Sequence, residues 1–162
     1  MKIEGISFIQ QEDSCCIPAS LFCLLEFIQH KTDLSQLDLL TKIAQVSAQR
    51  SISYYLSVVI VFEKIGLNSS ITTYVNDSFS NYTEWFNNIS RLLDNGIPVV
   101  FSTRWTSDET HSRVIYGINE DEKLFYIMNP NDEEETEYSF DRALKDFNLD
   151  NPCRDQLWIT KV

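Results

Sequence analysis

The chain enters its first apolar helix through a stretch that contains two adjacent thiols, residues 10–20: Gln10-Gln11-Glu12-Asp13-Ser14-Cys15-Cys16-Ile17-Pro18-Ala19-Ser20. Asp13 or Ser14 can cap this helix, and Pro18 fits its first turn, where an amide proton would have no partner. The apolar residues that follow recur at helical spacing and predict one buried face, up to about His30: Ile17, Leu21, Leu24, Leu25 and Ile28. The helix is therefore expected to begin at the cysteines.

A thiol at the start of a helix is well placed to act as a nucleophile. The helix dipole and the free N–H groups of the first turn stabilise a thiolate, and a nearby imidazolium does the same. The phasing of the helix favours Cys16 over Cys15, as does the spacing of six residues from Gln10. The alternative is that both are small, buried apolar side chains, and the local sequence alone does not separate the two interpretations.

The first half of the chain predicts mostly helices and the second half mostly strands. Helices are expected over about 34–46, 53–65, 82–93 and 141–147, although the run 58–62 could also form a strand. Strands are expected over about 71–75, 97–104, 111–118, 124–129 and 157–162. We therefore expect a single α+β domain over residues 1–162, with an N-terminal helical half packed on a C-terminal antiparallel sheet.

Two polar residues on neighbouring predicted strands are candidates for the rest of a catalytic site. His111 begins a strand and shares one predicted face with Arg113, Ile115 and Gly117; its imidazole could accept a thiol proton. Asn129 ends the next strand, where it could reach His111 and fix its tautomer. A satisfied histidine at a strand edge and an ordinary Asn-Pro turn are the alternatives.

Further candidates lie around these residues. Gln10 could donate a side-chain N–H to a developing oxyanion, or it could be a solvated strand residue. Trp105, in the loop before His111, could line a substrate cleft or pack as an ordinary core residue. The acidic run 131–135 lacks the spacing of a calcium loop and is interpreted as a solvated turn that could also border the cleft.

Taken together, these residues resemble a known family. Gln10, followed by Cys16-Ile17-Pro18-Ala19-Ser20 and a helix, is similar to the opening of papain-like cysteine peptidases, and is closest to the bacteriocin-processing (double-glycine leader) group and its stand-alone relatives. Members of that group also carry a stretch similar to residues 96–100 ahead of the strand with the histidine. Their pattern of His, Gly and Asp/Asn-Pro matches His111, Gly117 and Asn129-Pro130. The resemblance covers roughly residues 10–130.

The resemblance implies a papain-like fold and assigns roles to four residues. Cys16 would attack, His111 would be the base, Asn129 would orient it, and Gln10 would form the oxyanion hole. The implied activity is peptide hydrolysis through a thioester, on a peptide or protein substrate and with no cofactor. Amide acyl transfer or deamidation on the same triad is an alternative.

The sequence departs from the family at three positions. Ile17 replaces the usual Gly, Ser112 replaces a bulky apolar residue, and Asn129 stands where the closest group more often has Asp. Because Ile17 replaces the usual Gly, a catalytically inactive relative that only binds a peptide is an alternative.

Composition excludes several other classes of protein. A net charge of −11 with no basic cluster disfavours nucleic acid and anionic membranes as partners. The four cysteines lack metal-ligand spacing, so no metal site is expected. The sequence also contains no apolar run long enough for a membrane span or a signal peptide, which favours reduced thiols and a cytoplasmic location. A role coupled to export would need a partner protein.

Overall fold

The computed structural model describes residues 1–73, 79–104, 110–131, 134–149 and 155–159. In this part of the chain the helices α1 (Cys16–Phe27), α2 (Gln36–Arg50) and α3 (Tyr54–Lys64) come first, followed by β1 (Ser69–Thr73) and α4 (Phe79–Asp94). The rest forms β2 (Val99–Arg104), β3 (Thr110–Asn119), β4 (Leu124–Asn129), β5 (Glu134–Ser139), α5 (Phe140–Leu149) and β6 (Asp155–Ile159). The expected α+β fold is confirmed.

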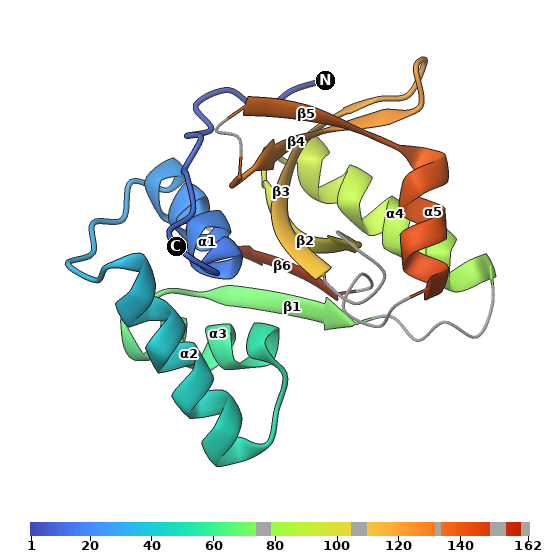
Figure 1. Cartoon of the computed structure of the whole chain (residues 1–162). Coiled ribbons are helices and arrows are strands. Elements are labelled where there is room, and N and C mark those ends of the chain that lie inside the picture. Colours follow the sequence, from blue (N-terminus) through green and yellow to red (C-terminus); the bar gives the residue numbers. More distant parts are fainter. Residues whose placement is uncertain (74–78, 105–109, 132–133, 150–154, 160–162) are drawn as a thin grey trace.

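One antiparallel sheet forms the centre of the molecule. Its strand order is β1-β6-β2-β3-β4-β5, so β3 lies between β2 and β4 in the interior of the sheet. Helices α1 to α3 lie on one side of the sheet and α4 and α5 on the other (Figure 1). The start of β3 and the end of β4 therefore lie at the same end of the sheet, because the two strands are antiparallel.

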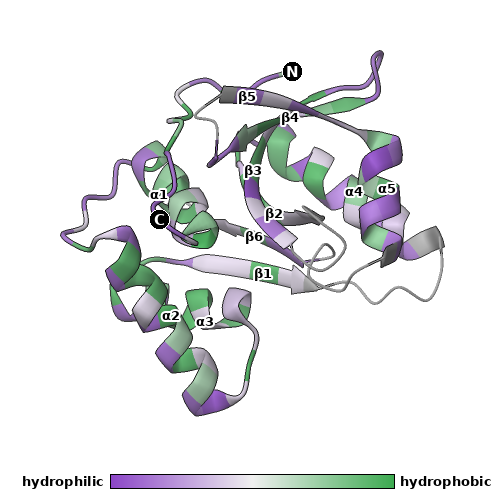
Figure 2. Cartoon of the chain, viewed as in Figure 1, coloured by the Kyte–Doolittle hydropathy of each residue, from purple (hydrophilic) through white to green (hydrophobic). Residues whose placement is uncertain are grey.

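Each face of the sheet carries its own core. On one face the helical half packs against the sheet, and Leu24, Phe62 and Val114 belong to the same buried cluster. On the other face aromatic residues dominate, with Trp85 from α4 and Phe147 from α5 among them. Figure 2 shows that α1 is mostly hydrophobic along its length, whereas α5 is more hydrophilic. The helix that starts at the cysteines is thus firmly embedded.

The ends and faces of two helices differ from the sequence prediction. The N-cap of α1 is Cys15, with no side-chain cap hydrogen bond, and not Asp13 or Ser14; Ser14 takes a positive φ of 58°. In α2, Ser35 and Asp38 form a capping box, so the helix starts later and buries Leu39. Leu37, two residues before Leu39, is 61% exposed as a result.

The second half contains one strand that the sequence analysis missed. Residues 131–135 were interpreted as a solvated turn, but β5 begins at Glu134 and pairs with β4 along its length. Acidic residues are poor strand formers, and the pairing partner on the interior of the sheet overrides that preference. A β-bulge between Ile115 and Gly117 also changes the alternation of β3, so Ile115 and Gly117 do not share a face as expected.

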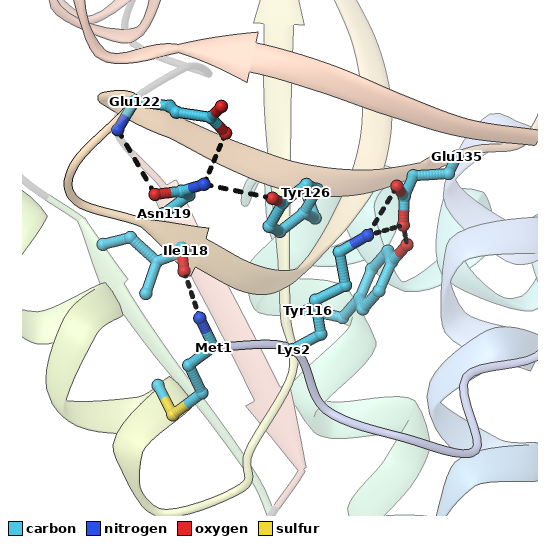
Figure 3. Close-up of polar contacts among 8 residues, drawn as sticks. All are labelled: Met1, Lys2, Tyr116, Ile118, Asn119, Glu122, Tyr126 and Glu135. Atoms are coloured by element: carbon cyan, nitrogen blue, oxygen red, sulfur yellow. Dashed lines mark hydrogen bonds and ion pairs between the residues drawn. The ribbon is translucent and has the colours of Figure 1, made fainter.

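The N-terminal segment lies antiparallel alongside β3 at Gly117 and is fixed to it (Figure 3). The backbone N–H of Ile3 donates to Tyr116 O at 2.8 Å, and that of Ile118 donates to Met1 O at 2.9 Å. The Lys2 ammonium pairs with Glu135 at 2.7 Å. A Cβ on Gly117 would lie 2.8 Å from Met1 O, so only glycine allows this close approach. The chain thus reaches residue 10 from a fixed starting point.

Candidate active site

The thiols at the start of α1 differ in accessibility. Cys15 is 1% exposed, and burial, followed by the charge of Glu12, raises its pKa. Cys23, about two turns further along the helix, is fully buried, which raises its pKa to about 12. Cys16, the first residue of α1, is half-buried. Among the cysteines in the described residues, Cys16 is therefore the one that a reagent or substrate can reach; Cys153 lies outside those residues.

His111 and Asn129 form a hydrogen-bonded pair inside the protein. The distance from His111 Nε2 to Asn129 Oδ1 is 3.2 Å, and both residues are buried. The backbone N–H of Asn131 donates to the same Oδ1 at 3.4 Å. Because a backbone N–H can only donate, the Asn129 oxygen faces both groups, and Nε2 must carry the proton. In the neutral imidazole Nδ1 then carries the lone pair that can accept a proton.

A backbone contact brings the segment before α1 to this pair. The N–H of Gln11 donates to Pro130 O at 2.9 Å, and Pro130 directly follows Asn129. Helix α1 also packs on β3, the strand that begins near His111. The start of α1, the start of β3 and the end of β4 therefore converge at one end of the sheet.

A buried hydroxyl cluster lies between α3 and the strands beside His111. Tyr55 OH contacts Ser102 Oγ at 2.8 Å and Ser112 Oγ at 3.0 Å. Burial raises the pKa of Tyr55, its bonds to the two serines oppose this, and the charge of Cys16 adds to the rise. The tyrosine hydroxyl thus contacts the residue that directly follows His111. The small side chain of Ser112 leaves room for the tyrosine hydroxyl.

The segment that carries Gln10 is held from α2. Gln10 is exposed, and its carbonyl oxygen accepts from Gln36 Nε2 at 2.7 Å. The neighbouring Gln11 is half-buried, and its Oε1 is buried without a hydrogen-bond partner among the described residues. Trp105, the remaining candidate, lies outside the described residues.

Sequence reasoning missed Gln36 and the Tyr55 cluster. Gln36 contacts residues 24 and 26 positions earlier in the chain, and no local pattern indicates such contacts. Ser112 was noted only as a departure from the family pattern, although a polar residue inside a buried strand is itself a signal of a buried hydrogen-bond partner.

The acidic run does not form a separate site. Glu135 accepts from Lys2 Nζ and from the Tyr116 hydroxyl, so it belongs to the contacts that fix the N-terminal segment. In the part of the chain that the structure describes, no cluster of His, Cys, Asp or Glu is arranged to hold a metal ion.

The fold, with N-terminal helices against a C-terminal antiparallel sheet, is that of papain-like cysteine peptidases. Residues 3–150 match the Peptidase_C39 like family, and the chain belongs to this family. The family and the fold are thus those of cysteine peptidases.

Two solved structures are similar over nearly the whole chain. A protein from Bacillus anthracis described as a C39-like peptidase is 14% identical, with 99% of this chain and 97% of that chain covered and a TM-score of 0.66. The Pseudomonas avirulence protein AvrPphB is 12% identical, with 99% and 98% covered and a TM-score of 0.53. At these identities the likeness concerns the fold. No curated protein matches the chain.

None of the helices in the described residues has the length and apolar character that a membrane span requires.

Proposed function

We propose that the protein is a cysteine peptidase that hydrolyses a peptide bond through Cys16, His111 and Asn129. The observation that carries the proposal is the buried hydrogen bond from His111 to Asn129, at the end of the sheet where α1 begins. The Nδ1 lone pair of a histidine held in this tautomer can take a thiol proton. Membership of the C39-like family supports the same reaction class, and the likeness of residues 10–20 to leader peptidases favours a peptide substrate.

The reaction would follow two stages. In the first, Nδ1 of His111 takes the proton of Cys16, and the sulfur attacks the carbonyl carbon of the scissile bond. The tetrahedral oxyanion then collapses, the C–N bond breaks, and His111 returns the proton to the leaving amine. In the second stage His111 takes a proton from water and the resulting hydroxide attacks the thioester carbonyl. The C–S bond then breaks, the acid leaves, and His111 returns its proton to the Cys16 sulfur.

The oxyanion would be stabilised by donors beside the sulfur. The candidates are the side-chain amide of Gln10 and the backbone N–H of Cys16 in the first turn of α1. Removing one such donor typically lowers turnover by about 10²–10³-fold. Gln10→Ala should therefore cause a loss of this order, whereas Gln11→Ala, as the neighbouring glutamine, should cause a much smaller one.

The proposal makes one geometric demand. Side chains alternate along a strand, so His111 and Ser112 leave β3 on opposite sides, and Ser112 is the one that reaches α3. His111 must therefore meet Cys16 at the end of the strand and not across the helical face of the sheet. Trp105, which follows the last residue of β2 in the sequence, is our candidate for the wall of the substrate cleft.

Selective alkylation tests the nucleophile. Wild-type protein treated with limiting iodoacetamide should be modified at Cys16, and Cys16→Ala should abolish this labelling and the hydrolysis of a peptide library. Cys15→Ala is the matched control and should leave both intact. Equal labelling of the two variants would overturn the assignment.

A second candidate, an inactive relative that binds a peptide, is favoured by one observation. Ile17 stands in the first turn of α1, where the family has Gly, and its half-buried side chain packs against the helical core. A branched side chain there could restrict the approach of a substrate carbonyl to the first-turn N–H groups. The variant Ile17→Gly separates the two candidate functions. A large gain in peptide hydrolysis over the wild type supports the inactive relative, and hydrolysis at the rate of an active wild type supports the peptidase.

A further inference from the structure

Gln36, the first residue of α2, makes two hydrogen bonds to the segment that leads into Cys16. Its Nε2 donates to the carbonyl oxygen of Gln10 at 2.7 Å, and its Oε1 accepts from the backbone N–H of Glu12 at 3.0 Å. The two bonds lie on either side of Gln11. One side-chain amide therefore holds the backbone at both ends of a three-residue stretch.

This pair of contacts requires an amide. The carbonyl of Gln10 needs a donor and the N–H of Glu12 needs an acceptor, and a carboxylate supplies only acceptors. The two backbone partners also fix which end of the Gln36 amide is the nitrogen. The capping box of Ser35 and Asp38 holds the start of α2 independently of these bonds, so Gln36 acts from a fixed position.

The rest of the segment is anchored by other contacts. Upstream, the backbone N–H of Ile3 donates to Tyr116 O, and downstream α1 is embedded in the helical core. Gln11 donates its backbone N–H to Pro130 O, beside Asn129. Gln36 adds the contact at Gln10 itself, the residue whose side chain would have to point at the oxyanion.

We propose that Gln36 is a positioning residue, which orients Gln10 for stabilisation of the oxyanion during the reaction at Cys16. This inference rests on the proposed role of Gln10. An oxyanion donor is effective only when it is held close to its productive position before the charge develops. Gln10 lies outside any helix or strand, so its orientation depends on the contacts of its backbone. Gln36 supplies that orientation without touching the substrate.

Two reactions of the same sulfur test the proposal without knowledge of the natural substrate. Acylation by p-nitrophenyl acetate passes through an oxyanion, whereas alkylation by iodoacetamide displaces iodide at a saturated carbon and forms none. Gln36→Glu keeps the size of the side chain but replaces the donor to Gln10 with a carboxylate oxygen. It should lower the acylation rate about tenfold, as expected for the loss of one oriented hydrogen bond, and leave the alkylation rate unchanged.

A double-mutant cycle shows whether the effect passes through Gln10. In a Gln10→Ala background, Gln36→Glu should cause no further loss of acylation, because the group that it orients is absent. Gln49→Glu, at an exposed glutamine later in the same helix, is the matched control for the change of charge. It should leave both the acylation rate and the alkylation rate as in the wild type.

The outcomes are distinct. An equal acylation loss in both backgrounds, or no loss in the wild-type background, overturns the role of Gln36. If Cys16→Ala leaves both reactions unchanged, the proposed function fails first. If Cys16→Ala abolishes both reactions while Gln36→Glu alters neither, the peptidase assignment stands and only the inference about Gln36 is wrong.

Discussion

The two parts of the proposed site are held by different means. His111 and Asn129 lie on β3 and β4, where each pairs with a residue of a neighbouring strand, Thr103 and Glu134 respectively, and this pairing fixes the backbone. Residues 10–14 have no regular structure, and single contacts from Gln36 and Pro130 hold them beside α1. A change in the side chain of His111 or Asn129 should therefore alter the reaction rate with little effect on the backbone of the site. The position of residues 10–14, in contrast, should depend on contacts from other parts of the chain.

The largest effect is expected at the base. His111→Gln removes the proton acceptor but not the ladder bonds of β3, so hydrolysis should fall by about 10²–10⁴-fold, the usual contribution of a general base. Thermal unfolding should change little. His30→Gln, outside the proposed site, is the control and should keep full activity. A His111→Gln variant with wild-type turnover would remove the histidine from the mechanism.

The next effect is on stability. Gly117→Ala places a Cβ 2.8 Å from Met1 O and 3.0 Å from the Tyr126 ring. Such overpacking costs about 1–3 kcal/mol, which urea unfolding would detect. The N-terminal segment that this Cβ displaces leads to residues 10–14, where Gln10 is the proposed oxyanion donor. The acylation rate should therefore fall more than the alkylation rate, because alkylation forms no oxyanion. Unchanged stability would show that the N-terminal segment is not fixed as described.

A smaller effect is expected at Asn129. Asn129→Ala removes one acceptor from His111 Nε2, a loss of about 1 kcal/mol or fivefold in kcat/KM. Asn129→Asp keeps an oxygen at this position and should restore most of the activity. If the Ala and Asp variants are equally impaired, the role of Asn129 is in packing and not in orienting the imidazole.

The smallest effect concerns pH. The hydrogen bond from Lys2, followed by that from Tyr116, lowers the pKa of Glu135 below its ordinary value of 4.5. A carboxyl with a lowered pKa stabilises the fold above its ordinary pKa, and this contribution is lost as the pH falls through the lowered value. Glu135→Gln should therefore be slightly less stable than the wild type at pH 7, and the difference should vanish in acid. A difference that grows in acid would contradict the assigned direction.

Much of the fold could be predicted from local patterns. The α3 segment contains the run 58–62 that could suit a strand, but Ser53 before it and Gly66 after it indicate a helix, and the structure has one. Strand β4 matches its predicted limits because apolar residues and turns bound it clearly. Strand β5 was missed because its acidic residues are paired by a neighbour that no local window contains.

The site was predictable only where residue type and order carry the chemistry. Cys16, His111 and Asn129 were selected as chemical groups, and the order of the strands suggested that the last two could meet. The contacts of Gln36 and Tyr55 join segments far apart in sequence, and glutamine and tyrosine are common residues with no distinguishing spacing. Contacts of this kind depend on how α2 and α3 pack on the sheet, which the order of the elements does not specify.

The rate of Cys16 alkylation in the presence and absence of the imidazole tests the central contact most directly. Iodoacetamide reacts with the thiolate, so a base that takes the thiol proton speeds the reaction. The proposed mechanism predicts that His111→Gln slows alkylation of Cys16 at neutral pH by about tenfold or more. A tenfold change corresponds to a loss of about 1.4 kcal/mol in the stabilisation of the thiolate by the imidazole. Equal rates in the wild type and in His111→Gln would mean that the sulfur and the imidazole do not meet.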